Sequence, residues 1–533
     1  MSLTKASFSM ITGAPANVLD FGADPTGTTD STLAFNQALN YTSVITSNSQ
    51  NNVRQTVIVP AGNYLIGGTV YIQKGMHLKG SGDGPSRIII PVTNFAGPTF
   101  LLGWGLYNGV PTQSGGGLPP SISDLCTEGG STNSLGYVID GGATAGANIY
   151  NMFITTAPTG LNINNGDLNI YNVIFDNCAT GCVVNNSSGI SRVVMDACDF
   201  YNCNYGFSST GYIYDFILSN CYFFASKYND INIGSSSPVK NFNINNCTFT
   251  YNTQYNTNTS CISFNASSSD FSVQACNFRN NPSTAIAVSG SNNLVNVFDS
   301  IFDGVATNSG YTQGTTANAF SAVGSGHKLN ISDNTFINQT YTTQCIYFNA
   351  LTSTTVNFTN NDWASISASQ LITFNGNCSS LFVNALSNSG DSVTPLSNLT
   401  TTAVLHAKGN VNWFGPWITS GSVKYIQIPT NGYLNAQVGI SAETNTGGST
   451  SYNKSGYYSA VRYADYSGTA IDDYVVITAL YAAPNSSYAP AIAPTITLDT
   501  PTGGTSGVYS QARYVVISVS NSYVITSTSV DCL

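Results

Sequence analysis

The sequence has 533 residues, of which only 8% are charged, and 15 Lys+Arg stand against 25 Asp+Glu for a formal charge of −10. Soluble domains usually carry charge on roughly a quarter of their residues, so polar uncharged side chains must cover most of this surface. The lack of a basic stripe excludes nucleic-acid binding, and short, interrupted apolar runs exclude membrane insertion. Hydrophobic residues make up 42% of the chain and exclude general disorder. The N-terminal segment MSLTKASFSMITG contains no readable secretory signal.

The first predicted element is a short helix that follows Thr29 and Asp30, either of which is suited to cap it. Its expected apolar face consists of Leu33, Ala34, Ala38 and Leu39. Such a helix can cover the open end of a stack of strands, whose edge otherwise stays free to pair. We therefore predict that residues 1–55 form an N-terminal leader and a helix-capped start. Residues 94–120 are too long for a turn and are predicted to be a loop inserted between coils.

A repeat of about 27 residues follows, in which apolar and polar residues alternate, break at one position and end on an aromatic residue. The closing residues are Phe175, Phe200, Phe223, Phe249, Phe278, Phe302, Phe336 and Trp363. The residues at the break are Asn172, Ala197, Asn220, Asn246, Ala275, Asp299, Asp333 and Asn360. Most of these types tolerate the left-handed backbone of a tight bend. A second short strand follows each unit, so the pattern predicts an all-β, right-handed parallel β-helix over residues 56–400.

Four cysteines occupy one column of this repeat, two residues before the aromatic residue: Cys198, Cys221, Cys247 and Cys276. A zinc site needs ligands that converge on one ion, whereas a ladder of thiols among apolar neighbours indicates core packing. Buried free thiols without a signal sequence favour folding in a reducing cytoplasm.

The coil pattern stops near residue 400. Residues 401–533 contain alternating strands, such as 422–428, 473–481 and 513–520, between runs of Gly, Pro, Ser and Asn. This arrangement is typical of an antiparallel β-sandwich. Trimerisation and carbohydrate binding are both suitable roles for it.

The run VLDFGADPTGTTDSTLAFNQAL (18–39), followed by V-x-V-P-A-G-x-Y-L-I (57–66), resembles the first segment of the pectate-lyase-like β-helix superfamily. This segment is especially common in bacteriophage tailspike proteins. The resemblance implies a rigid homotrimer on the virion that binds and usually cleaves a bacterial surface polysaccharide. Tailspikes often carry a further N-terminal virion-binding domain. Here attachment to phage tail or baseplate proteins is expected through the short leader or another tail protein, unless such a domain was removed.

The register of the repeat predicts which outward side chains become neighbours, because stacked strands lie about 4.8 Å apart. Glu128 and Asp176 share the column just after the aromatic residue, two coils and about 9–10 Å apart. Asp199 lies one coil beyond Asp176 and two residues along, at about 8 Å. Inverting glycosidases hold their two carboxyls about 6.5–9.5 Å apart, so these three acids are the candidate catalytic residues. Any one of them is alternatively a solvated turn residue.

Outward aromatic residues beside these acids are candidates for stacking on sugar rings: Tyr201, Tyr222 and Phe224. A subunit contact in a trimer would explain them as well. Arg279 and Asp303 are predicted neighbours that form either a sugar-binding pair or an exposed ion pair of little energetic value. Trp104, in the 94–120 segment, either closes over a substrate or packs its loop. His77, His327 and His406 lie far apart in the repeat, and no metal site or cofactor is predicted.

Three functions fit these observations. The first is a tailspike that hydrolyses the capsule or O-antigen of its host, made in the host cytoplasm and acting from the virion at the bacterial surface. The second is a polysaccharide lyase, which needs a basic residue beside the acids, and the coils offer only Arg192, Lys227, Lys240 and Arg279. The third is a non-catalytic fibre that binds glycan without cutting it.

Overall fold

The computed structural model describes residues 14–386 with gaps, and beyond them the backbone of the strands as far as Cys532. The gaps fall at 45–54, 83, 92–96, 108, 114–117, 130–135, 142–145, 165, 186–189, 235–237, 251–259, 280–283, 306–317, 340–343, 365–369, 376–377 and 379–380. The chain forms two compact units, residues 1–281 and 282–533, which are described separately.

The first unit begins with a helix-capped start, as predicted. Its elements are β1 (Ala16–Asn17), η2 (Val18–Phe21), β2 (Thr26–Asp30) and α1 (Thr32–Val44). The Asp30 carboxylate accepts hydrogen bonds from the Thr32 backbone N–H at 2.9 Å and from the Gly67 N–H at 3.1 Å, so Asp30 rather than Thr29 secures the start of α1. The predicted apolar face of α1 is wrong at Leu33, which is 68% exposed. Phe35 is fully buried instead.

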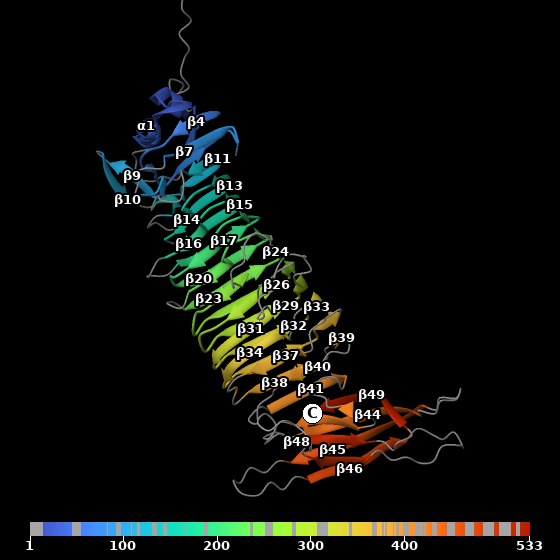
Figure 1. The fold of residues 1–533 in the computed structure, drawn as a ribbon. Helices are drawn as coiled ribbons and strands as arrows, with labels where there is room; N and C mark the ends of the chain where they lie inside the picture. Colours follow the sequence, from blue (N-terminus) through green and yellow to red (C-terminus); the bar gives the residue numbers. More distant parts are fainter. Residues whose placement is uncertain are drawn as a thin grey trace, which may run out of the picture. The chain divides into compact units, whose positions relative to one another are not determined.

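Stacked parallel strands form the rest of this unit, and Figure 1 shows their coils. One sheet contains β3 (Gln55–Ile58), β4 (Gly62–Leu65), β6 (Met76–Lys79), β7 (Ser86–Ile90), β11 (Ser121–Gly129), β13 (Ala147–Thr155), β15 (Leu168–Asp176), β17 (Ile190–Asp196), β18 (Asp199–Tyr201), β20 (Ile213–Ser219), β21 (Tyr222–Phe224), β23 (Val239–Asn245), β24 (Thr248–Thr250), β26 (Asp270–Gln274) and β27 (Asn277–Arg279). A second sheet contains β5 (Val70–Ile72), β8 (Phe100–Leu102), β12 (Tyr137–Asp140), β14 (Thr159–Ile163), β16 (Thr180–Val184), β19 (Tyr205–Ser209), β22 (Asn229–Ile233) and β25 (Ile262–Phe264). Each strand pairs with its counterpart in the next coil, which confirms the predicted parallel β-helix.

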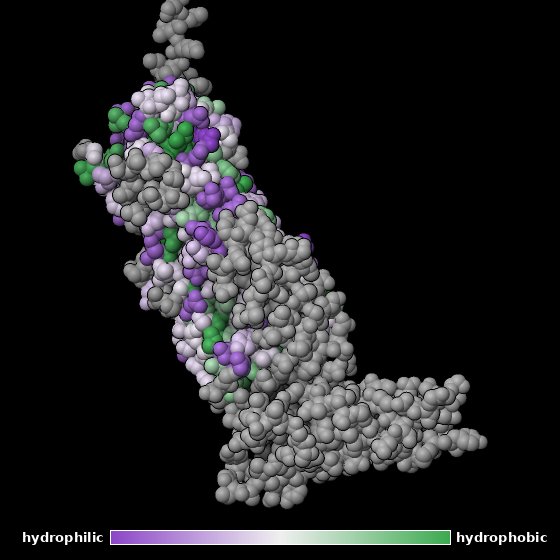
Figure 2. All heavy atoms as spheres, in the orientation of Figure 1, coloured by the Kyte–Doolittle hydropathy of each residue, from purple (hydrophilic) through white to green (hydrophobic). Residues whose placement is uncertain are grey.

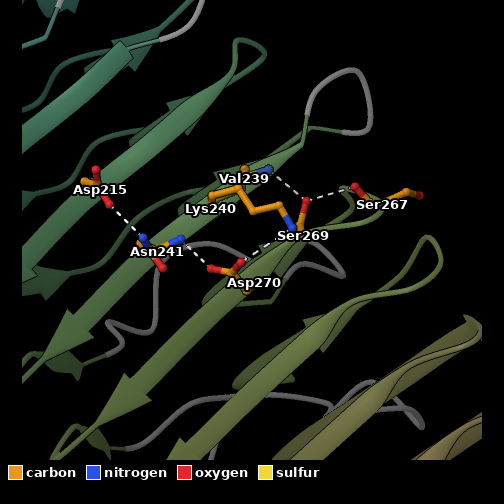
Figure 3. Close-up of polar contacts among 7 residues, drawn as sticks. All are labelled: Asp215, Val239, Lys240, Asn241, Ser267, Ser269 and Asp270. Carbon is orange, nitrogen blue, oxygen red and sulfur yellow. Dashed lines mark hydrogen bonds and ion pairs between the residues drawn. The ribbon is translucent and has the colours of Figure 1, made fainter.

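Bends in the left-handed conformation separate the strands. All eight residues predicted at the break have positive φ, from 51° to 57°. Their side chains form ladders between coils, as where the Asn246 amide donates to the Asn220 Oδ1 at 2.6 Å. Another bend carries the ladder in Figure 3, where the Asn241 amide donates to Asp215 at 2.7 Å and the Asn241 backbone N–H donates to Asp270. The Lys240 ammonium lies 3.5 Å from the same Asp270 carboxylate. These side chains satisfy polar groups where the backbone leaves the sheet.

The core repeats one packing unit in each coil. Phe175, Phe200, Phe223, Phe249 and Phe278 are stacked, with ring centroids 4.6–4.9 Å apart. The four predicted inward cysteines are buried free thiols, which confirms their packing role. Each donates a hydrogen bond to a backbone carbonyl, as the Cys247 Sγ does to the Asn245 oxygen at 3.3 Å.

The segment predicted as an inserted loop is partly sheet, so that prediction was incomplete. β8 pairs with both β5 and β12 and therefore belongs to the stack. β9 (Trp104–Tyr107) and β10 (Val110–Gln113) form an antiparallel hairpin beside it, visible in Figure 1.

The second unit continues with parallel strands of the same kind. They are β28 (Ile286–Val288), β29 (Leu294–Phe298), β30 (Ile301–Val305), β31 (Phe320–Ser325), β32 (Lys328–Ser332), β33 (Thr335–Gln339), β34 (Gln344–Thr352), β35 (Thr355–Thr359), β36 (Asp362–Ala364), β37 (Gln370–Asn375), β38 (Phe382–Leu386), β39 (Ser389–Gly390), β40 (Thr394–Ser397) and β41 (Val404–Asn410). A buried Asn334–Asn361 pair, joined at 3.0 Å, stands at the bend where the first unit has cysteines. Parallel pairing extends through β41, past residue 400.

Antiparallel strands follow from Thr419 on, so they begin later than the predicted start at residue 401. They are β42 (Thr419–Ser420), β43 (Val423–Ile428), β44 (Leu434–Thr444), β45 (Asn453–Tyr463), β46 (Tyr474–Ala482), β47 (Thr495–Asp499), β48 (Arg513–Ser518) and β49 (Tyr523–Cys532). They form a four-stranded sheet, β42-β43-β48-β47, and a second set in which β44 pairs with β45 and β49. The packing of these sheets as a sandwich, and a role in trimerisation or sugar binding, stay predictions.

The described surface is polar but carries few charges. Figure 2 shows mostly purple and pale residues on the coloured part of this face, with small, separate green patches. Neither helix among the described residues is long and apolar enough to cross a membrane.

One buried carboxyl interrupts the regular core. Gly160, Gly181 and Gly206 face the edges of the stacked Phe rings, where a Cβ on Gly206 would approach the Phe223 ring to 2.9 Å. In the next coil the corresponding residue is Asp230, which is buried. Burial raises the pKa of Asp230 to about 7, and the nearby Ser226 hydroxyl and Cys261 thiol offset only part of this shift.

Replacing Phe200 by Ala should lower the free energy of unfolding by about 3–5 kcal/mol, because it removes a fully buried ring stacked on two others. Thermal unfolding followed by circular dichroism measures the effect. Tyr214→Ala, at a side chain that is 41% exposed, is the control. Equal loss in both variants would contradict a core role for the stack.

Asp230 should make the protein less stable as the pH rises. Between pH 3.8 and about 7 the unfolded chain loses the proton of this carboxyl while the folded chain keeps it, so the free energy of unfolding falls by about 4 kcal/mol. Asp230→Asn should remove this component and raise the unfolding midpoint most above pH 7. A parallel pH profile for wild type and Asp230→Asn would show that the carboxyl is ionised when folded.

Candidate functional site

The predicted outward columns exist in the first unit. Glu128 pairs in register with Thr155, Thr155 with Asp176, and Asp176 with Tyr201. The same column continues through Phe224 and Thr250 to Arg279. In the neighbouring column, Ile174 pairs with Asp199 and Asp199 with Tyr222. The side chains chosen from the sequence therefore lie on adjacent strands of one outward surface.

Asp176 and Asp199 occupy different environments on this surface. The Thr155 hydroxyl donates to Asp176 Oδ2 at 3.3 Å. Burial raises the pKa of Asp199, and a hydrogen bond from the Tyr201 hydroxyl, at 3.5 Å, opposes that rise. Asp199 lies one coil beyond Asp176 and two residues away along the strand, so the two positions are about 8 Å apart. Each carboxylate thus accepts a hydrogen bond from a neighbouring hydroxyl, and burial raises the pKa of Asp199.

Glu128 has a partner that the sequence analysis missed. It forms an ion pair with Arg87 of β7, and both side chains are substantially exposed, at 41% and 45%. β7 lies beside β11, with Cys126 opposite Arg87, so the arginine reaches the glutamate diagonally. This pair brings a cation beside the acidic column, in addition to the four basic residues predicted in the coils.

The three predicted aromatic residues contact one another. Tyr201 lies 5.8 Å from Tyr222 and 6.1 Å from Phe224, measured between ring centroids, and Tyr222 lies 6.2 Å from Phe224. All three are half-buried, so each ring keeps exposed area beside the acids.

The remaining candidates are not brought to this cluster by the described contacts. Arg279 is exposed at the far end of the column, three strands beyond Tyr201. Asp303 belongs to the second unit, so its predicted pairing with Arg279 stays a prediction. Trp104 is half-buried in the β9–β10 hairpin, opposite Gln113.

A buried serine–histidine contact was also missed. His77 Nε2 lies 2.9 Å from the Ser123 hydroxyl and 3.0 Å from the Tyr150 hydroxyl, and Ser123 donates to Asp124 at 2.7 Å. Ser123 is completely buried, so its oxygen is closed to a polymeric substrate. The cluster fastens β6, β11 and β13 together. In the sequence, only the pairing of β6 with β11 could have indicated this cluster. The residues inserted between these two strands hide that pairing.

Two family comparisons identify the coils. The Rhamnogalacturonase A/epimerase, pectate lyase-like family matches residues 16–122, and the right-handed β-helix region family matches residues 159–336. The chain folds as a right-handed β-helix. Among the described residues of this β-helix protein, no group of three or more His, Cys, Asp or Glu side chains is placed to hold a metal ion.

The chain is also similar to several solved structures. The tailspike of E. coli bacteriophage HK620, solved with a pentasaccharide, is 13% identical and has a TM-score of 0.48, with 98% of this chain and 96% of that chain covered. A mutant DFA-IIIase from Arthrobacter chlorophenolicus A6, in complex with DFA-III, is 11% identical with a TM-score of 0.45 over 74% and 98%. The A-module of the mannuronan C-5 epimerase AlgE4 from Azotobacter vinelandii is 13% identical with a TM-score of 0.38 over 74% and 100%. No curated protein matches the sequence.

Proposed function

We propose that the protein is a phage tailspike that binds a bacterial surface polysaccharide, capsule or O-antigen, and hydrolyses it with inversion. The observation that carries this proposal is the pair Asp176 and Asp199, whose separation of about 8 Å leaves room for a water molecule. Neighbouring Tyr201, Tyr222 and Phe224 offer apolar faces for sugar rings. The match to a rhamnogalacturonase and epimerase family supports carbohydrate chemistry on this scaffold.

The two acids take different roles in this mechanism. Asp199, whose pKa is raised by burial, donates its proton to the glycosidic oxygen as that bond breaks. Asp176 takes a proton from a water molecule, whose oxygen attacks the anomeric carbon from the opposite face. Glu128 is a second candidate for the base, and Arg87 holds its carboxylate in place.

The Arg87–Glu128 pair keeps a polysaccharide lyase as the second candidate. A lyase removes a proton from the carbon beside a sugar carboxylate, and Arg87, beside the acidic column, supplies a cation that can stabilise the negative charge formed there. A lyase would release products with unsaturated ends that absorb in the ultraviolet, whereas a hydrolase would release new reducing ends. A non-catalytic fibre would bind the polymer and leave its size unchanged.

The same proposal covers where the protein folds, how it assembles and to what it attaches. The protein folds in the host cytoplasm, consistent with its buried free cysteines, assembles as a homotrimer, and attaches through its N-terminal region to phage tail or baseplate proteins. Analytical ultracentrifugation tests the trimer.

Asp176→Asn and Asp199→Asn should each reduce cleavage at least about a hundredfold, because each removes a general acid or base. Reducing ends released from purified capsular and O-antigen polysaccharides measure the rate, and Asp215→Asn, at an exposed acid on another bend, is the matched control. Glu128→Gln distinguishes the two candidates for the base. Full activity in all three site variants would place the active site elsewhere.

The pH profile should identify Asp199 as the acid. Activity should fall as the pH rises through the raised pKa of this carboxyl, because the proton donor is then lost. Tyr201→Phe removes a hydrogen bond that stabilises the ionised form, so it should raise the pKa of Asp199 further and move this alkaline limb to higher pH. An unchanged or lower limb in Tyr201→Phe would contradict the assignment.

A further inference from the structure

Two more aromatic residues lie beside the candidate site, in the same two coils as the predicted three. Tyr205 begins β19, four residues after Tyr201, and Tyr228 stands just before β22, four residues after Phe224. Their ring centroids lie 5.2 Å apart, and both residues are half-buried. Neither was chosen from the sequence, because neither falls in the two outward columns that flank the stacked Phe residues.

The two aromatic groups lie on either side of one bend. Asn202 and Ala225 have φ of 52° and 61° and turn the chain between the two sheets. Tyr201, Tyr222 and Phe224 stand before this bend, and Tyr205 and Tyr228 stand after it. The row of rings therefore runs around the coil, across the long axis of the stack.

At the register positions that the structure describes, the neighbouring coils lack these rings. Before it, the corresponding register positions hold Ile174, Asp176 and Thr180. After it, Thr248 and Thr250 follow Tyr222 and Phe224. The inward Phe rings recur from coil to coil because each one packs on the next and fills the core. The five half-buried outward rings stand in two adjacent coils, and packing of the repeat does not require them.

We infer that this row is an extended glycan-binding track, in which the polysaccharide lies across the stack from Asp176 and Asp199 around the bend to Tyr205 and Tyr228. The inference rests on the proposed function and deepens it, because it gives the direction of the polymer and adds two binding residues. The acids and the first rings are register neighbours, Asp176 with Tyr201 and Asp199 with Tyr222, so the track begins at the reacting bond.

The ring environments favour a sugar polymer over a protein partner. Tyr rings combine an apolar face with a hydroxyl, which suits sugar rings that present C–H groups and hydroxyls together. The Lys227 ammonium lies 5.4 Å from the Tyr228 ring centroid, a cation–π contact that holds this ring at the end of the row. Two more exposed tyrosines, Tyr171 in the preceding coil and Tyr214 in the second of these coils, lie outside the track.

The test uses the full-length protein with Asp199→Asn, which should bind without cutting, and a panel of purified capsular and O-antigen polysaccharides with oligosaccharides made from them by mild acid. Adding Tyr205→Ala and Tyr228→Ala should weaken binding of the long oligosaccharides at least about tenfold, since two stacking contacts are lost. Binding of fragments of one repeating unit, which reach only the first rings, should change less than about twofold. Isothermal titration calorimetry measures both affinities.

Tyr214→Ala in the same background is the matched control, because it removes an exposed ring from one of the same coils, and Tyr205→Phe with Tyr228→Phe should keep long-chain binding. Unchanged long-chain affinity in the double Ala variant, or a loss equal to that of Tyr214→Ala, would overturn the track while leaving the proposed function standing. An equal loss for short and long oligosaccharides would also overturn it. Failure of the parent protein to bind any polysaccharide would overturn the proposed function and the track with it.

Discussion

The structure depends on the parallel register between successive coils. Backbone hydrogen bonds hold each strand about 4.8 Å from its counterpart, so a residue in one coil faces the same position in the next. Inside, this register turns one aromatic residue per repeat into a stack of rings 4.6–4.9 Å apart. Outside, it turns residues far apart in sequence, such as Thr155, Asp176 and Tyr201, into neighbours. The same constraint therefore builds the core and assembles the candidate site.

This constraint also decides what the sequence could predict. A fixed period of bends and aromatic residues was enough to place the columns, including Asp199 opposite Tyr222. The period fails before residue 121, where an insertion separates strands that pair. For this reason Arg87 beside Glu128, and His77 beside Ser123, could not be foreseen. Helix α1 presented a related difficulty, because its buried face is set by the strand ends beneath it, and these select Phe35 rather than Leu33.

Because charged residues are scarce in this protein, burial has an unusually large effect on the pKa values of Asp199 and Asp230. In a protein with many Lys and Arg residues, nearby cations would lower the pKa of most carboxyls. Here burial is the main cause of the raised pKa of both Asp199 and Asp230. At Asp199 this shift falls on an outward residue beside another carboxyl, where a retained proton is useful for acid catalysis. At Asp230 it falls among a thiol, a hydroxyl and the Phe stack, where it only costs stability. In the proposed mechanism the raised pKa serves acid catalysis at Asp199, whereas at Asp230 it only lowers the stability of the fold.

Departures from the repeat carry more functional information than the repeat itself. The inward Phe and Cys columns are explained once the coils stack, since each member supports the next. The outward positions have no such requirement, and most of them hold small polar residues such as Thr248 and Thr250 that satisfy the surface without specificity. Three adjacent coils instead place two acids and five aromatic rings around one bend. Exposing apolar rings to water is unfavourable. A ligand that covers these rings removes them from water, which gives their exposed position a physical reason.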